Sequence, residues 1–303
     1  MERCGNDGPV SLCYLDSPKR GTYFQNVTTL TDTHPLLKDC IDQFRKEGYT
    51  STPAFFSARE IDAMRAELDR FCREGLIRNV ATDDDGETHS EEIHNLQICP
   101  ITPKSDFYRT LPQHPKVIAA IGQLIGDPFV FYLDQIFLKP PKTGIGTDWH
   151  QDNAYFKIAD PTKGTAMWVA LHDANIGNGT LHVIPRSDIT PYDHDRDPRS
   201  DHHIHCPVPE DQAVPIELPA GGVAFFNYGT AHSTKANLSN HERAGLALHF
   251  LRTDFIPDHV LEKESRRYSH ITGPQATGGL EEYGTTVAGT WDEQVERVLA
   301  STE

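Results

Sequence analysis

The chain has 303 residues, of which 37% are hydrophobic and 24% are charged, and its formal net charge is −16 at pH 7. This composition is typical of a soluble globular protein and argues against wholesale disorder. The acidic balance disfavours nucleic acid and anionic membrane surfaces as partners, because both bind basic surfaces, and no apolar run approaches the roughly 20 residues that span a bilayer.

The segment before residue 127 is predicted to be mainly helical. Leu37, Ile41 and Phe44 recur at spacings of four and three, which indicates a helix that ends at a glycine. Ser57 and Glu60 form the sequence pattern of a capping box in front of an apolar stripe. A third helix is expected over about 115–124. We therefore assign 34–126 to a helical N-terminal part.

From residue 129 onward, aromatic and β-branched runs alternate with polar turns, which is typical of short antiparallel strands. The predicted strands cover 129–138, 165–171, 179–184, 222–226 and 243–251. Such an order favours a mainly β fold with flanking helices, an antiparallel sandwich or jelly roll. We expect a single domain over 1–303, with its core at about 129–255 and an irregular tail over 256–303.

An irregular insertion over 191–208 is predicted to be a solvated loop. It carries four histidines, and we expect no second metal site from them: His194, His202, His203 and His205. The six cysteines of the chain contain no CxxC pair, which favours free thiols in a reducing compartment. No signal-peptide pattern follows Met1. We expect a cytoplasmic protein.

The motif His150-Gln151-Asp152 is the first candidate for chemistry. On a strand, alternate side chains share a face, so the imidazole and the carboxylate would point the same way. Two imidazoles and one carboxylate on one face of the metal's octahedron suit Fe(II). The opposite coordination positions then stay open for substrate and oxygen. A lone His-x-Asp is weak support in a chain with 16 histidines. His232, which follows the strand over 222–226, is the candidate for the second imidazole.

Arg243 and Thr234 are candidates for binding a dicarboxylate. A guanidinium and a hydroxyl can neutralise a buried carboxylate, which is costly when unpaired. Residues 243, 245, 247 and 249 would share one face of the last strand, where Gly245 and Ala247 leave space beside the arginine.

These stretches together resemble the phytanoyl-CoA dioxygenase superfamily of iron(II)/2-oxoglutarate oxygenases. The matching segments lie within about 36–255, and they include Leu138-Lys-Pro-Pro141, Trp149-His-Gln-Asp152, Trp168-Val-Ala-Leu171, Gly221-Gly-Val-Ala-Phe-Phe226, His232-Ser-Thr234 and Arg243. The residues over 186–188 depart from the Gly-Ser-His that many members carry. The insertion and the tail after residue 258 have no counterpart in the family.

The resemblance implies a double-stranded β-helix, the cupin-like jelly roll, with Fe(II) held by His150, Asp152 and His232. It also implies that 2-oxoglutarate is bound by Arg243 and Thr234. A further two candidates for the 2-oxoglutarate site are Trp168 and Lys139. The candidates for the substrate pocket are Gln135, Asn153, Tyr155, His172 and His249.

The expected reaction is oxidation of an unactivated C–H bond of a small metabolite or natural-product intermediate, with O2 as oxidant and succinate and CO2 as products. Hydroxylation is the first expectation. Desaturation, epimerisation and cyclisation stay open, as does a cupin-like metal-binding protein that does not use 2-oxoglutarate. Halogenation is disfavoured because Asp152 is present, and net acidity weakly disfavours a CoA thioester. The oligomeric state cannot be read from the sequence.

Overall fold

The computed structural model describes residues 35–261, 268–279 and 286–301. Its α-helices are α1 (Lys38–Glu47), α2 (Ala58–Arg73), α3 (Asp106–Thr110), α4 (Pro115–Ile125), α5 (Asn153–Phe156), α6 (Asp258–Leu261) and α7 (Trp291–Ala300). The capping box of Ser57 and Glu60 is present at the start of α2. Helix α1 ends at Gly48, whose φ of 83° lies in the left-handed region that favours glycine.

The strands form two antiparallel sheets and a hairpin. The large sheet has the order β1-β10-β5-β12-β4-β3-β2, and β13 pairs with β4 beside this path. Its strands are β1 (Tyr49–Thr52), β2 (Arg78–Asn79), β3 (Leu96–Ile98), β4 (Phe129–Lys139), β5 (Gly164–Ala170), β10 (Val223–Asn227), β12 (Arg243–Arg252) and β13 (Ser269–His270). The small sheet, β11-β6-β9, comprises β11 (His232–Thr234), β6 (Leu181–Val183) and β9 (Val214–Ile216). The hairpin pairs β7 (Asp195–Arg196) with β8 (Ile204–His205).

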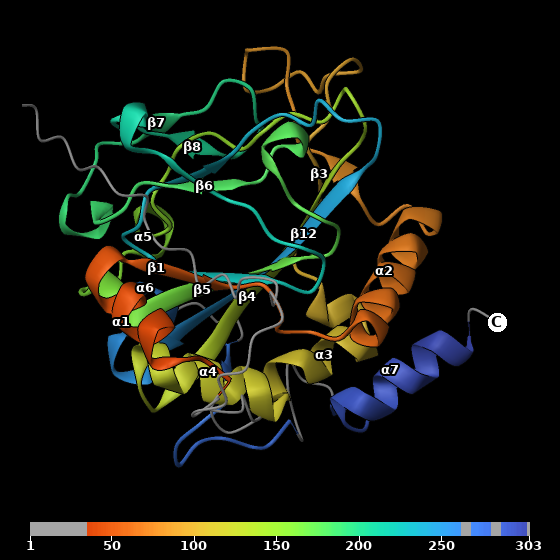
Figure 1. Ribbon diagram of the computed structural model, residues 1–303, viewed down its shortest axis with the longest axis vertical. Coiled ribbons are helices and arrows are strands. Elements are labelled where there is room, and N and C mark those ends of the chain that lie inside the picture. The colour runs from red at the N-terminus through yellow and green to blue at the C-terminus, as the bar shows by residue number, and fades with distance from the viewer. Residues whose placement is uncertain (1–34, 262–267, 280–285, 302–303) are drawn as a thin grey trace, which may run out of the picture.

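Strict alternation along the central strands gives the large sheet two different faces. On β5, Met167 and Val169 pack into the cluster that includes α2 and α4, whereas Ala166 and Trp168 face the small sheet. Figure 1 shows α1–α4 and α7 gathered on one side of the strands, opposite β6 and the β7–β8 hairpin. The fold is a jelly roll backed by helices, as predicted, and the space between its sheets is available for a site.

The segment over 34–126 is mainly helical, as predicted, and it also contributes strands, because β1 extends the large sheet at β10 and β3 extends it at β4. The prediction of an irregular tail is wrong. Thr290 and Glu293 form a capping box that begins α7, and Trp291 is buried in the main core.

None of the helices in the described part of the chain combines the length and the apolar character needed to cross a bilayer. The cytoplasmic location stays a prediction.

Candidate metal centre

His150 and His232 lie opposite each other as a backbone bridge. The amide of His150 donates to the carbonyl of His232 at 3.0 Å, and the amide of His232 donates back at 2.9 Å. The prediction that Asp152 shares a strand with His150 is wrong, because the chain turns after the bridge. Asp152 has helical backbone angles and is the N-cap of α5. The turn still brings its carboxylate beside both imidazoles.

The three side chains converge on one point in a buried pocket. Each offers one ligand atom, and these atoms lie within 4.8 Å of one another. Nε2 of His150 and Nε2 of His232 are each 3.7 Å from Oδ1 of Asp152. Two imidazoles and one carboxylate form the donor set that Fe(II) takes with positions left open, so the residues present fit this metal.

The outward nitrogen of each imidazole is already engaged. Nδ1 of His150 lies 2.8 Å from the carbonyl of Asp148, and Nδ1 of His232 lies 3.0 Å from that of Thr230. Such contacts fix the tautomer and leave Nε2 as the metal-binding atom. Burial lowers the pKa of both rings to about 4, an effect that His232 reinforces for His150. Both imidazoles are therefore neutral at pH 7, which is the form that binds a metal.

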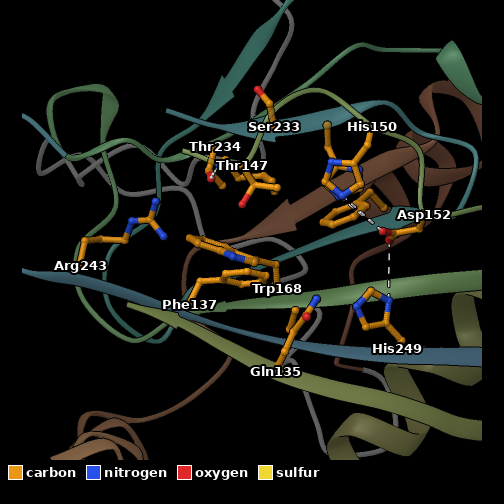
Figure 2. A pocket seen from close by; sticks show the side chains of 14 residues that line it. Gln135, Phe137, Thr147, His150, Asp152, Trp168, Ser233, Thr234, Arg243 and His249 are labelled. Atoms are coloured by element: carbon orange, nitrogen blue, oxygen red, sulfur yellow. Dashed lines mark hydrogen bonds and ion pairs between the residues drawn. The ribbon is translucent and has the colours of Figure 1, made fainter. Parts of the chain in front are cut away.

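The pocket around these residues extends to Arg243. Figure 2 shows Asp152 at one end, Arg243 at the other and Trp168 between them. The pocket is lined by Gln135, Phe137, Thr147, His150, Asp152, Trp168, Leu181, Phe226, His232, Ser233, Thr234, Arg243, Ala247 and His249. The predicted shared face of β12 is confirmed, since Ala244, Leu246 and Leu248 pack into the opposite core.

Arg243 is fully buried and keeps one donor free. Its Nη2 donates to the carbonyl of Gly179 and its Nε to that of Asn178 at 3.4 Å, whereas Nη1 has no hydrogen-bond partner in the described residues. Burial lowers the pKa of Arg243 to about 9, so the guanidinium is charged at pH 7. A buried cation with an unpaired N–H is a binding site for an anion, because leaving it unpaired costs free energy.

Thr234 and Trp168 lie at the same end of the pocket. Oγ1 of Thr234 accepts a hydrogen bond from the amide of Thr147 at 3.1 Å, and its hydroxyl proton is available to a ligand. The Trp168 ring centroid lies 5.7 Å from Cζ of Arg243. The ring occupies the space that a side chain at Gly245 would need. The residues at this end therefore fit a carboxylate of 2-oxoglutarate.

Four of the predicted site residues do not reach the pocket wall. Lys139 is buried behind it, and its amine is already used by the carbonyls of Lys235 and Gly179. The Asn153 side chain bonds the backbone of Ile158, and the Tyr155 hydroxyl accepts from the amide of Ile204 at 3.0 Å. Nδ1 of His172 accepts from the amide of Ala244 at 3.1 Å. Backbone groups thus satisfy these four side chains.

Four polar or aromatic wall residues were not predicted, namely Phe137, Thr147, Phe226 and Ser233. A signal existed for the first, because the alternation that selects Gln135 and Lys139 on β4 places Phe137 between them on the same face. Thr147 lies in an irregular segment, and its position depends on pairing with Thr234, which no local pattern indicates.

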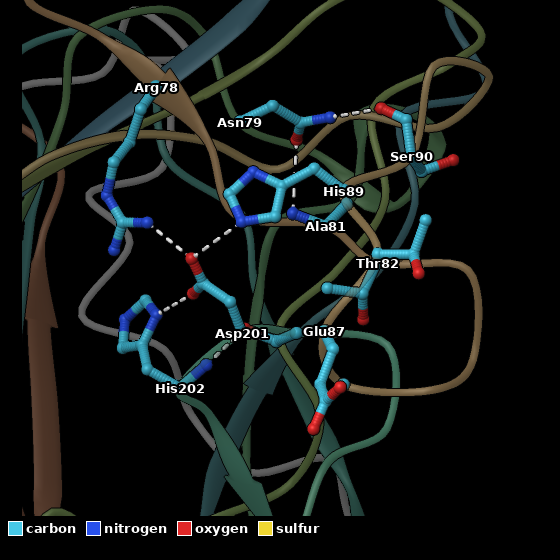
Figure 3. A network of polar contacts seen from close by, with 12 residues as sticks. Arg78, Asn79, Ala81, Thr82, Glu87, His89, Ser90, Asp201 and His202 are labelled. Carbon is cyan, nitrogen blue, oxygen red and sulfur yellow. Dashed lines mark hydrogen bonds and ion pairs between the residues drawn. The ribbon is translucent and has the colours of Figure 1, made fainter.

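The prediction that the insertion over 191–208 is a solvated loop is wrong, because parts of it are buried and hydrogen-bonded to the rest of the chain. His203 is 5% exposed, and Nε2 of His194 accepts from the amide of Gln151 at 3.0 Å. Figure 3 shows how Asp201 ties the insertion to the 78–90 segment. Its carboxylate contacts Arg78 and His202, and its Oδ2 lies 3.4 Å from Nε2 of His89.

Comparison with known proteins agrees with this geometry. The family model described as phytanoyl-CoA dioxygenase matches residues 44–245. An ectoine dioxygenase of Bordetella parapertussis is 24% identical over 232 residues, which cover 70% of this chain and 74% of that protein.

Two solved structures share the fold. The non-haem α-ketoglutarate-dependent carbocyclase SnoK from nogalamycin biosynthesis has a TM-score of 0.61 and 20% identity, covering 87% of this chain and 98% of its own. The epimerase SnoN, in complex with Fe3+, α-ketoglutarate and nogalamycin RO, has a TM-score of 0.62 and 21% identity, covering 84% and 96%.

Proposed function

Since the chain belongs to the phytanoyl-CoA dioxygenase family and is thus a non-haem Fe(II)/2-oxoglutarate-dependent dioxygenase, we propose that it hydroxylates an unactivated C–H bond of a small metabolite or natural-product intermediate. The observation that carries this proposal is one pocket with two opposite ends. Three metal-binding side chains lie at one end and a buried arginine with a free N–H lies at the other.

In this proposal His150, Asp152 and His232 hold the iron. The bound iron and 2-oxoglutarate supply the oxidising chemistry, in which one atom of O2 enters succinate as CO2 leaves and the other enters the substrate. The backbone bridge fixes the spacing of the two histidines, and the turn into α5 fixes the position of the Asp152 carboxylate. The protein contributes orientation of the reactants and exclusion of water, and needs no acid–base residue for the transfer.

Arg243 binds the far carboxylate of 2-oxoglutarate through its free Nη1, and the Thr234 hydroxyl donates to the same group. Trp168 closes the side of this subsite. Lys139 does not contact the cosubstrate but helps to position Arg243. Both side chains donate to the carbonyl of Gly179, which fixes the position of the guanidinium.

Gln135 and His249 line the part of the pocket nearest to the metal ligands and are the residues proposed to face the substrate. Asn153 and Tyr155 lie behind the wall next to the metal ligands, whereas His172 lies behind it at the arginine end, beside Ala244. A small polar substrate suits the net charge of −16 better than a CoA thioester with its phosphates. Epimerisation and cyclisation, the activities named for SnoN and SnoK, are alternatives on the same scaffold.

The test is an anaerobic titration of 2-oxoglutarate into the Fe(II)-loaded protein, followed by the weak visible charge-transfer band of the complex. We expect a saturable band that the Arg243→Gln variant develops only at much higher 2-oxoglutarate concentrations. A metal-binding jelly roll that does not use 2-oxoglutarate would give no band. A metabolite panel screened for stimulated succinate release, with mass spectrometry for gain of one oxygen atom, then identifies the substrate and separates hydroxylation from its alternatives.

A further inference from the structure

The two oxygens of the Asp152 carboxylate face different neighbours. Oδ1 lies 3.7 Å from Nε2 of both His150 and His232, so it is the oxygen directed at the metal position. Oδ2 lies 3.7 Å from Nδ1 of His249, on β12. Figure 2 shows His249 approaching the carboxylate from the side opposite to His150. His249 therefore belongs to the outer side of the carboxylate and not to the ligand set.

Both groups are buried, and in the described part of the chain they have no other hydrogen-bond partners. His249 is 2% exposed, and within the described residues neither of its ring nitrogens has a hydrogen-bond partner. Oδ2 of Asp152 is unpaired in the same way. An unsatisfied buried polar atom costs about 1–3 kcal/mol. A hydrogen bond between the unpaired nitrogen and the unpaired oxygen, which face each other, would therefore lower the free energy.

The His249 ring is fixed from several sides. The pairing of β12 with β4 shifts register between His249 and Phe250, an irregularity of the kind that re-aims side chains near active sites. The ring of Phe156 packs edge-on against the imidazole at 5.2 Å, and Tyr228 lies at 5.9 Å. Because Asp152 is the N-cap of α5 and Phe156 is its last residue, the same short helix positions the carboxylate and the ring that packs against His249.

We infer that His249 is a positioning residue of the metal centre, whose Nδ1–H donates to Oδ2 of Asp152 and so presents Oδ1 alone to the iron. The inference rests on the proposed function, in which Asp152 is an iron ligand. Closing the 3.7 Å separation to a hydrogen bond of about 2.9 Å needs only a small rotation of the carboxylate. Partners of this kind orient metal ligands, and their loss costs about 10- to 100-fold in metal affinity.

The experiment measures Fe(II) affinity of the full chain without 2-oxoglutarate, anaerobically, by competition with a chelating dye. His249→Asn retains an N–H near the position of Nδ1, whereas His249→Gln places its N–H near Nε2. We expect Asn to stay within about threefold of wild type and Gln and Leu to weaken binding by about 10- to 100-fold. The Asn and Gln variants are both polar and differ mainly in where the donor lies, so the comparison holds even if Leu fails to fold.

His270→Leu, on β13 and outside the pocket wall, is the matched control and should bind iron as wild type does. Equal affinity in the wild-type, Gln and Leu proteins would overturn the inference. So would equal losses in Asn and Gln, because the imidazole would then be needed for packing and not for its Nδ1–H. Asp152→Ala separates the two proposals, since undiminished iron binding in that variant would refute the proposed metal centre itself.

Discussion

His150 and His232 are 82 positions apart in the chain and exchange both of their backbone hydrogen bonds, at 3.0 and 2.9 Å. In an antiparallel bridge of this kind, the two side chains project from the same side of the sheet. The backbone therefore sets the distance between the two imidazoles, and side-chain packing is not needed to place them opposite each other.

Removal of the Arg243 guanidinium should weaken 2-oxoglutarate binding. We expect Arg243→Gln to raise the Kd by about 30- to 1,000-fold, or about 2–4 kcal/mol, because a buried carboxylate would lose its cation. Arg243→Lys should restore only part of this, since an ammonium lacks the planar fork. The anaerobic charge-transfer titration measures the Kd. Arg252→Gln, at the other end of β12, is the control and should match wild type; an unchanged Kd in Arg243→Gln would place the cosubstrate elsewhere.

Gly245 should not tolerate a side chain. A Cβ at this position would lie 2.6 Å from three atoms of the Trp168 ring. Gly245→Ala should lower the free energy of unfolding by about 1–3 kcal/mol and weaken 2-oxoglutarate binding, because the ring must move. Urea unfolding measures the first effect. The double variant Gly245→Ala/Trp168→Leu should regain stability relative to the sum of the single changes, and strict additivity would contradict the proposed clash.

The residues of β12 show what the sequence could predict. Alternation placed Arg243 and His249 on the pocket face of this strand. Helix α7 was also predictable, because Thr290 and Glu293 carry the capping-box pattern that identified α2. The turn at Asp152 and the contacts of Asp201 were not, because both depend on partners far away in the sequence. The same holds for the hydrogen bond that the amide of Ala244 donates to His172.

Gln151 holds the insertion against the metal motif and should not tolerate a carboxylate. Its side-chain amide donates to the carbonyls of Ser187, Thr190 and Gly229, and its Oε1 accepts from the amide of Tyr192 at 3.0 Å. Gln151→Glu would direct an acceptor at three acceptors, at a cost of about 2–4 kcal/mol.

The near-isosteric Gln151→Met only removes the bonds, so it should be less harmful than Gln151→Glu. Urea unfolding gives the order of stability, and limited proteolysis should cleave the 191–208 insertion fastest in Gln151→Glu. Stability equal to wild type in both variants would show that the amide protons do not hold this insertion.

Glu60 should make stability depend on acid pH. Burial opposes its ionisation, but hydrogen bonds from His114, Ser57 and Trp291 outweigh that effect and lower its pKa to about 2. Because the folded-state pKa lies below the ordinary value of 4.5, the carboxylate contributes stability above pH 4.5, and this is lost as pH falls toward 2. The contribution is up to about 3 kcal/mol. Glu60→Gln should be less stable at pH 7 and show a flatter pH profile in urea unfolding; parallel profiles would contradict this.

The most direct test of the iron centre is the release of CO2 from 2-oxoglutarate labelled at C1, in air, with the full chain and added Fe(II). We predict release that needs iron, stops on chelation and falls by about 100-fold or more in Asp152→Ala, which loses one of three ligands. Release that continues without iron, or at an undiminished rate in Asp152→Ala, would contradict an iron site formed by His150, Asp152 and His232.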